Sequence, residues 1–250
     1  VYGFLKTDQA KTFEQERELD IGFLVPELSR FRVSVYRQRD SVAAVLRLVP
    51  LHVPRYSDIG IPDRLLMQMR NTTSGLILVT GPTGAGKSTT IASFLEFLNT
   101  EDDIARHIVT IEDPIEFYLP SKRCVIDQRE IGLDTHSYAR GLRSALRQMP
   151  HIIFVGEMRD RETIEVALTA AETGNVVIST LSTQSAAKTI NRIIDVFPLE
   201  QQAEIRTRLA LTLRIVVSQI LLPRIDAEGR IAAREVMFVN NAVYNQVREG

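Results

Sequence analysis

The glycine-rich stretch from residue 81 to residue 88 carries residue types that hold phosphate groups in proteins. It reads Gly81, Pro82, Thr83, Gly84, Ala85, Gly86, Lys87 and Ser88, is followed by Thr89, and matches G-x-x-x-x-G-K-[ST] without a mismatch. Its glycines permit backbone angles that let N–H groups approach a ligand closely. We expect Lys87 to reach the β- and γ-phosphates and the Ser88 hydroxyl to bind Mg²⁺. The stretch therefore predicts a site for ATP and Mg²⁺.

The residues on either side supply the elements that this motif needs. The apolar run 76–79 precedes it and predicts a buried strand. Apolar residues at Ile91, Phe94, Leu95 and Leu98 follow at helical spacing. A strand, the loop and a helix are thus predicted in order, and the positive end of the helix faces the phosphate.

Two groups of acids follow later strands and are candidates for catalysis. The apolar strand 151–156 ends at Glu157, and Gly156 stands where many nucleotide hydrolases place a metal-binding aspartate. We expect Glu157 to hold Mg²⁺ through water or to orient the attacking water. Glu112, Asp113 and Glu116 follow another β run and repel one another unless cations neutralise them. The alternative for this second group is a solvated acidic turn.

Three arginines are spaced so that one helix face would carry them. Arg140, Arg143 and Arg147 lie at i, i+3 and i+7 of a predicted helix. One guanidinium could stabilise charge on a γ-phosphate, in this subunit or in a neighbouring one. The other interpretation, a face of arginines paired with carboxylates, stays open at this stage.

Composition limits the class of protein. The 250 residues are 44% hydrophobic and 24% charged, which predicts a globular chain of one large or two modest domains. The net charge of -1 argues against a general nucleic-acid binder. The single cysteine, Cys124, favours a reducing compartment and excludes a four-cysteine zinc site in this chain. No apolar run approaches a membrane span. Because Val1 is the first residue, we expect further residues before it.

The order of patterns along the chain predicts two domains. Residues 1–50 predict a partial small α+β domain, with a helix at 8–18 and strands at 20–25, 30–36 and 41–49. Prolines and a glycine mark a linker at 51–62. Residues 63–250 alternate between the two kinds of element, which predicts a parallel sheet with helices on both faces. The expected strands there are 76–80, 107–112, 124–128, 151–156, 175–181, 215–222 and 231–238, and the expected helices are 63–70, 87–99, 135–148, 160–172, 185–194 and 199–213. A turn at 226–229 and a last helix capped by Asn240 or Asn241 complete the pattern.

In combination these pieces resemble the secretion and pilus ATPases, in particular the type IV pilus retraction motors. The matching segments are 81–88, 110–116, 142–147, 156–163, 167–174, 185–189 and the front-domain residues 31–33. The resemblance implies an α/β fold with a RecA-like P-loop core and a smaller PAS-like N-terminal domain. It also implies a cytoplasmic homo-hexamer that binds ATP between the domains and meets an inner-membrane pilus platform protein. Glu116 is then the activator of water, supported by Glu112 and Asp113, and Glu157 is the Walker B acid.

Two segments differ from the pattern of this family. The family has a histidine in Thr-Leu-His-Thr, where this chain has Ser182 in Thr180–Thr183. Ser182 can donate a hydrogen bond to phosphate, but its side chain is shorter and stays neutral. Residues 242–249 match the ending of the retraction branch only in part.

The function predicted from the sequence is a Mg²⁺-dependent ATP hydrolase that drives type IV pilus retraction. The lack of the four-cysteine zinc site favours retraction over pilus assembly. An accessory ring subunit, or another secretion ATPase with weak hydrolysis, is the alternative that Ser182 supports. A nucleic-acid translocase is a third, which the near-neutral charge disfavours.

Overall fold

The computed structural model describes residues 1–25, 29–50, 52–226 and 228–249. Its contacts divide the chain into two compact units. The first unit consists of Val1–His52 with Glu116–Tyr118, and the second consists of Val53–Ile115 with Leu119–Gly250. Each unit is described separately below.

The first unit is a small antiparallel sheet with one helix. The short 3-10 helix η1 (Tyr2–Phe4) and α1 (Thr7–Glu16) precede the strands β1 (Glu18–Val25), β2 (Ser29–Gln38) and β3 (Ser41–Val49). The strands pair in the order β1-β2-β3. Phe13 of α1 is fully buried against Ile21, Val33 and Val35. The predicted helix and three strands are confirmed, with ends that differ by two residues at most. The likeness to PAS domains stays a prediction.

The second unit is built on a seven-stranded sheet. Its strands are β4 (Gly75–Thr80), β5 (His107–Glu112), β6 (Val125–Glu130), β7 (Ile152–Val155), β8 (Val176–Leu181), β9 (Leu213–Pro223) and β10 (Arg230–Phe238). They lie in the order β10-β9-β4-β8-β7-β5-β6. All neighbouring pairs are parallel except β10, which pairs with β9 in the antiparallel sense at one edge. The predicted parallel sheet is confirmed.

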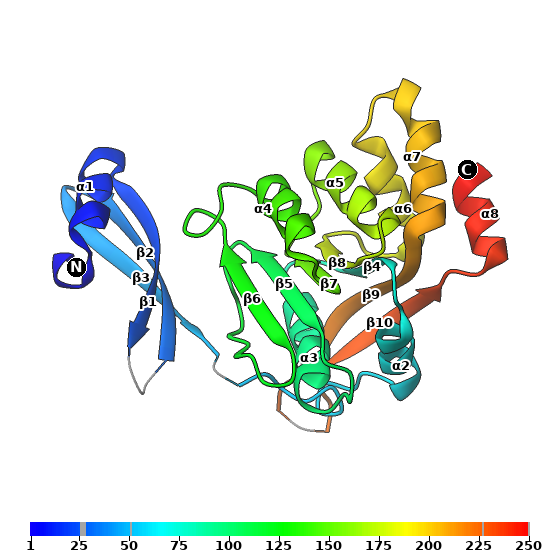
Figure 1. The fold of residues 1–250 in the computed structure, drawn as a ribbon. Coiled ribbons are helices and arrows are strands. Elements are labelled where there is room, and N and C mark those ends of the chain that lie inside the picture. Colours follow the sequence, from blue (N-terminus) through cyan, green and yellow to red (C-terminus); the bar gives the residue numbers. More distant parts are fainter. Residues whose placement is uncertain (26–28, 51, 227, 250) are drawn as a thin grey trace. The chain divides into compact units, whose positions relative to one another are not determined.

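Helices cover both faces of this sheet. They are α2 (Asp63–Asn71), α3 (Lys87–Thr100), α4 (Tyr138–Ala145), α5 (Arg161–Glu172), α6 (Ala186–Asp195), α7 (Leu199–Thr212) and α8 (Asn241–Glu249). Figure 1 shows α2 and α3 on one side of the sheet, and α4 to α7 on the other. The α/β fold expected for this part of the chain is confirmed.

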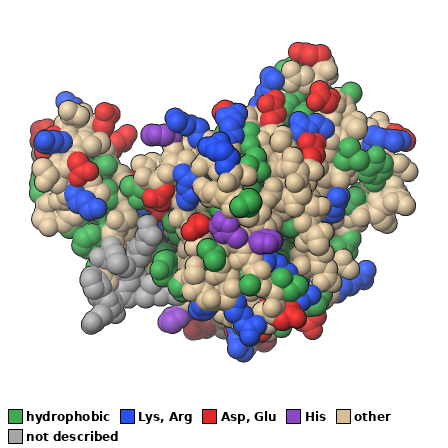
Figure 2. Space-filling model, in the orientation of Figure 1, with side chains coloured by type: hydrophobic (Ala, Val, Ile, Leu, Met, Phe, Trp, Pro, Cys, Tyr) green, Lys and Arg blue, Asp and Glu red, His purple; other side chains and the backbone are tan. Residues whose placement is uncertain are grey.

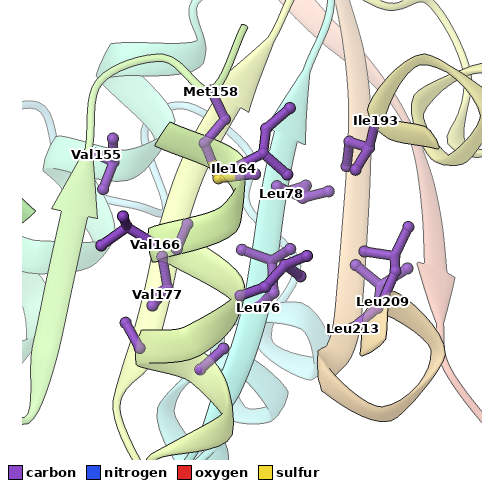
Figure 3. Packing of buried hydrophobic residues seen from close by; sticks show 14 of the residues in the cluster. Leu76, Leu78, Val155, Met158, Ile164, Val166, Val177, Ile193, Leu209 and Leu213 are labelled. Atoms are coloured by element: carbon purple, nitrogen blue, oxygen red, sulfur yellow. The ribbon is translucent and has the colours of Figure 1, made fainter. Parts of the chain in front are cut away.

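The central strand β4 shows why helices must cover both faces of the sheet. Leu76 and Leu78 pack with α5, α6 and α7 (Figure 3). Ile77 and Val79, which alternate with them, pack with α2 and α3. All four side chains are fully buried. Successive residues of a strand point to opposite faces, so a continuous apolar run is what a sheet covered on both sides requires.

The helix predicted at 135–148 is shorter than expected. The helix begins at Tyr138 and not at residue 135. It follows a tight loop at 131–135, in which Ile131 bridges to Thr135 and the N–H of Gly132 donates to the carbonyl of Thr135. Ser137 caps the helix by accepting a hydrogen bond from the N–H of Arg140. The α-helix ends at Ala145, and residues 146–148 continue as the 3-10 turn η2 (Leu146–Gln148).

The remaining boundaries agree with expectation. Asn240 accepts a hydrogen bond from the N–H of Val243 and so caps α8, as the sequence allowed. Part of the turn predicted at 226–229 falls on residue 227, outside the described residues. In the described part of the chain, no helix combines the length and the apolar character needed to cross a membrane.

Candidate nucleotide-binding site

The predicted site residues of the second unit follow strands that end at the same edge of the sheet. The strands β4, β8, β7, β5 and β6 are parallel neighbours in that order. Adjacent strands lie about 4.8 Å apart, so strand order estimates how far each following segment lies from the glycine-rich loop after β4. Ser182 follows β8 at one spacing, about 5 Å, Glu157 follows β7 at about 10 Å, and Glu112 ends β5 at about 14 Å.

The loop from Gly81 to Gly86 depends on its glycines. Gly81 has φ 147°, and a Cβ there would lie 2.2 Å from the backbone oxygen of Gln219. Gly86 has φ 82° and precedes the first residue of α3. Only glycine accepts both the angle at position 81 and the close approach of β9. The geometry thus fits the cradle that a phosphate requires, with helix α3 beginning directly after it.

Lys87 lies inside the curve of this loop. Its Nζ donates to the carbonyls of Gly81 at 2.8 Å and Pro82 at 3.1 Å. Ser88 and Thr89 follow in the first turn of α3, and both are half-buried. Thr83 and Gly84 at the tip are exposed, whereas Ala85 is buried. The ammonium group is therefore held at the mouth of the loop, where it can meet an anion.

Gln219 supports the loop from β9, and no motif in the sequence marks this residue. Its side chain is buried, donates to the carbonyl of Ala85 at 2.6 Å, and accepts from the hydroxyl of Thr90 at 2.9 Å. Thr80 and Ser218 share a second buried hydrogen bond between β4 and β9, at 2.8 Å. The only local signal was a polar pair, Ser218 and Gln219, in the middle of a mostly apolar strand.

Glu157 follows β7 in a turn that neighbouring strands hold in place. The N–H of Gly156 donates to Ile111 at 2.8 Å, and the carbonyl of Gly156 accepts from the Thr180 hydroxyl at 2.6 Å. The Glu157 side chain is 30% exposed, and Arg159 lies 3.5 Å from its carboxylate. This carboxylate is thus fixed by its backbone yet open to solvent, as a group that contacts a ligand must be.

Glu112 and Asp113 have different surroundings although they are adjacent. Glu112 is 7% exposed and accepts hydrogen bonds from the Thr110 hydroxyl at 2.6 Å and from Gln128 at 3.2 Å. Asp113 is exposed and is joined to Pro114 by a cis peptide bond. The solvated acidic turn that the sequence left open therefore describes Asp113 but not Glu112.

Glu116 belongs to the segment Glu116–Tyr118, whose contacts assign it to the first unit. Its side chain is exposed. Its role as the activator of water stays a prediction.

Tyr138 contributes a hydroxyl that the sequence analysis missed. A Cβ on Gly156 would lie 3.1 Å from this hydroxyl, so the tyrosine fills the space next to the missing side chain. Burial raises the pKa of Tyr138, and the carboxylates of Asp113 and Glu157 raise it further. The phenol therefore stays protonated beside the acids, where it can donate a hydrogen bond.

Ser182 and the three arginines are the remaining residues that the sequence predicted for the site. Ser182 is exposed directly after β8. Arg143 donates to Glu162 of α5 at 2.6 Å. Arg140 and Arg147 instead line a cavity at the α4 end of the unit. The expected common face therefore holds for Arg140 and Arg147, which line one cavity, but not for Arg143, which pairs with Glu162. Any contact of the arginines with a γ-phosphate stays a prediction.

A metal site made of protein groups alone is not found in this arrangement. Within the described ranges, no cluster of three or more His, Cys, Asp or Glu side chains is placed to hold a metal ion. Mg²⁺ in nucleotide enzymes takes one or two protein ligands and completes its shell with phosphate and water oxygens. The Ser88 hydroxyl and the Glu157 carboxylate fit that pattern.

The chain was compared with known proteins. The profile of the family described as type II/IV secretion system protein matches residues 20–248. The type IV pilus retractation ATPase PilT of Pseudomonas aeruginosa is 47% identical over 249 residues, which cover 100% of this chain and 71% of that protein. A twitching motility protein of Neisseria gonorrhoeae is 44% identical over 249 residues, which cover 100% and 66%.

A solved structure leads to the same group of proteins. The crystal structure of the pilus retraction motor PilT with bound ADP superposes with a TM-score of 0.94 at 47% identity. The superposition covers 99% of this chain and 71% of that one. The resemblance predicted from the ordered motifs is confirmed, and the chain belongs to the type II/IV secretion system protein family.

Proposed function

We propose that this chain is the ATP-hydrolysing subunit of a type IV pilus retraction motor. The observation that carries the proposal is the glycine loop at 81–88, with Lys87 at its mouth and Glu157 about two strand spacings, or about 10 Å, away. The biological role is supported by relatives named for pilus retraction and twitching motility, whose similarity extends over the whole of this chain.

The loop residues bind the nucleotide in this proposal. Backbone N–H groups between Gly81 and Ser88 donate to the phosphates, and Lys87 exchanges its contacts with the loop carbonyls for contacts with phosphate oxygens. Ser88 and Glu157 hold Mg²⁺, which neutralises charge on the phosphates when it is bound. Thr89 and Ser182 add hydroxyl donors at the same edge of the sheet.

The acids orient the water that attacks the γ-phosphate. Glu157 has the exposure that contact with water requires. Glu112 is held by Thr110 and Gln128, so we assign it a supporting role, together with Asp113. Glu116 is assigned as the activator of water on the family resemblance. We assign Tyr138 the role of a hydrogen-bond donor to these acids, because its raised pKa keeps the phenol protonated.

The assembly belongs to the proposal as well. We infer a homo-hexameric ring in which residues 1–50 form a PAS-like domain, 51–62 a linker and 63–250 the RecA-like ATPase domain. The ring acts in the cytoplasm at an inner-membrane pilus platform protein. No zinc and no nucleic acid takes part.

Phosphate release by the purified chain tests the enzymatic part. The wild type should release phosphate from ATP only with Mg²⁺ present, and Lys87→Ala and Glu157→Ala should each lower the rate by about 100-fold or more. Arg208→Gln, which alters an ion pair with Glu172 outside the predicted site, is a control that should keep the wild-type rate. A wild-type rate no higher than that of the two variants would refute an active motor.

Ser182 favours one alternative, an accessory ring subunit that binds nucleotide but hydrolyses it slowly. A neutral hydroxyl on a short side chain is a weaker partner for phosphate than the imidazole that the family pattern has there. The two functions are separated by binding and turnover measured together. An accessory subunit would bind ATP through Lys87 and release little phosphate.

A further inference from the structure

A cavity of about 330 Å³ lies between the end of β6 and helix α4. Its lining includes Arg129, Asp134, His136, Arg140 and Arg147. Figure 2 shows several basic side chains and a histidine close together on this part of the second unit. A volume near 300 Å³ is at the lower end of the range for small-molecule sites, so the cavity has room for a compact anion.

Arg129 shows that the cavity has an unused donor. Its Nη2 donates to the carbonyl of Asp134 at 2.9 Å, but its Nη1 is buried and has no hydrogen-bond partner among the described residues. The carboxylate of Asp134 accepts from the N–H of Glu130 at 2.8 Å. A buried donor without a partner destabilises the fold, and an acceptor bound in the cavity would remove that cost.

Arg140 and Arg147 add positive charge to a lining whose one carboxylate is that of Asp134. Within the part of the chain that the structure describes, neither forms an ion pair. Elsewhere arginines do find carboxylates, as Arg143 does on Glu162 and Arg106 does on the buried Asp102. Guanidinium groups gathered around one cavity repel one another. A bound anion attracts each of them and so offsets this repulsion.

The cavity is distinct from the site at the glycine loop. It follows β6, which lies four places from β4 in the sheet. Four strand spacings are about 19 Å, which is beyond the reach of an arginine side chain across the sheet. The arginines of this cavity therefore do not contact a phosphate held by the loop of the same chain.

We propose that this cavity is a second anion site, which binds a phosphate or diphosphate group through Arg129, Arg140 and Arg147. Planar guanidinium groups bind phosphate oxygens in pairs, and His136 adds a ring nitrogen. The phosphate comes either from a free anion or from a nucleotide bound to a second copy of the chain. Binding of a free anion does not depend on hydrolysis at the glycine loop, whereas the second-copy source rests on the proposed function.

Calorimetric titration with pyrophosphate tests the site directly. The titrated protein is the full chain with Lys87→Ala, so that the loop contributes little binding. We expect one saturable site, weakened at least about tenfold by Arg140→Gln combined with Arg147→Gln. Arg208→Gln is the matched control, because Arg208 pairs with Glu172 outside the cavity and its loss should leave binding unchanged. Melting temperatures near that of the parent verify that the variants fold.

A second experiment identifies the source of the phosphate. It uses chains with an intact Lys87 and measures ATP hydrolysis against protein concentration. Pyrophosphate binding lost in the double variant supports a free anion. No such binding, but a hydrolysis rate that rises with protein concentration in the wild type and not in the double variant, supports a nucleotide on a second copy. Equal behaviour of the double variant, Arg208→Gln and the wild type in both experiments would overturn the proposal.

Discussion

The glycine loop and the arginine cavity lie at the same edge of one sheet, but they present positive charge in opposite ways. The loop uses backbone groups whose positions are set by Gly81 and by the Gln219 support. The cavity uses long side chains on β6, on α4 and in the turn after it. Backbone donors are fixed before a ligand arrives, whereas arginine side chains lose rotamer freedom on binding. The comparison predicts a loop sensitive to backbone changes and a cavity sensitive only to charge.

The largest effect is expected from Gly81→Ala. The new Cβ would meet the backbone oxygen of Gln219 at 2.2 Å, so the loop must shift and ATP affinity should fall by at least about 100-fold, or about 3 kcal/mol. Gly132→Ala at the cavity is the counterpart, since Gly132 has φ 85° but no atom within 4 Å of its Cβ position. It should cost about 1–2 kcal/mol of stability and leave ATP binding intact. Titration with a fluorescent ATP analogue measures the ATP affinity of both variants. Equal losses of affinity would contradict the distinction between the loop and the cavity.

Asp102 shows how arginines are arranged where the chain itself provides the anion, and it can be compared with the arginine cavity. Its side chain is 1% exposed and pairs with Arg106 and with Arg70. Asp102→Asn leaves these guanidinium groups without a charge partner and should lower the free energy of unfolding by about 3 kcal/mol in urea denaturation at pH 7. Asp103→Asn, at an 83% exposed carboxylate, should change it by less than about 0.5 kcal/mol.

The same carboxylate predicts the sign of a pH effect. Burial alone would raise the pKa of Asp102, but hydrogen bonds from Arg106 and Arg70 outweigh it and hold the pKa at about 2. Because the folded pKa lies below the unfolded value, the stabilisation is complete above about pH 4 and is lost as the pH falls towards 2. Wild type and Asp102→Asn should therefore converge in stability on acidification. A constant difference down to pH 2 would contradict this assignment.

Gln219→Leu tests whether the loop needs its support from β9. The change leaves the Ala85 carbonyl and the Thr90 hydroxyl without their partner, at a cost of about 1–3 kcal/mol. We expect the KM for ATP to rise about tenfold with a smaller change in kcat, because Gln219 positions the loop and touches no phosphate. Gln68→Leu, at an exposed helix position, is the control. An unchanged KM would show that the glycines alone fix the loop.

The smallest effect is expected at Ser182. Ser182→His should raise the rate of phosphate release at saturating ATP by about tenfold, because an imidazolium donates a stronger hydrogen bond to phosphate than a hydroxyl does. Ser182→Ala should stay within about twofold of the wild type. A rate unchanged by histidine would show that this position does not limit turnover.

Local patterns predicted the elements of the fold well, because each has its own signal. The apolar run of β4, the glycine motif and the helical spacing of α3 are all read within a few residues. The contacts that set the site were not predictable in this way. Gln219 meets Ala85 across 134 positions of the chain, and no local pattern shows which strand will lie beside β4.

The arginines illustrate a second limit. Their spacing predicted one shared face, but Arg143 pairs with Glu162 of α5, whereas Arg140 and Arg147 line the cavity. Glu112 and Asp113 are adjacent in sequence, yet one is buried by Thr110 and Gln128 and the other is exposed. Burial of a polar residue depends on partners from other strands, which the sequence of a single segment does not contain.

The two outer strands of the large sheet have a consequence for association. At one edge β6 carries Asp127, Arg129 and Glu130, and at the other β10 carries Arg230, Arg234 and Glu235. Charged side chains on an edge strand oppose the addition of a further strand from another molecule. Both margins of the sheet are therefore protected against open-ended stacking into aggregates, and we expect copies of the chain to meet through helices and loops.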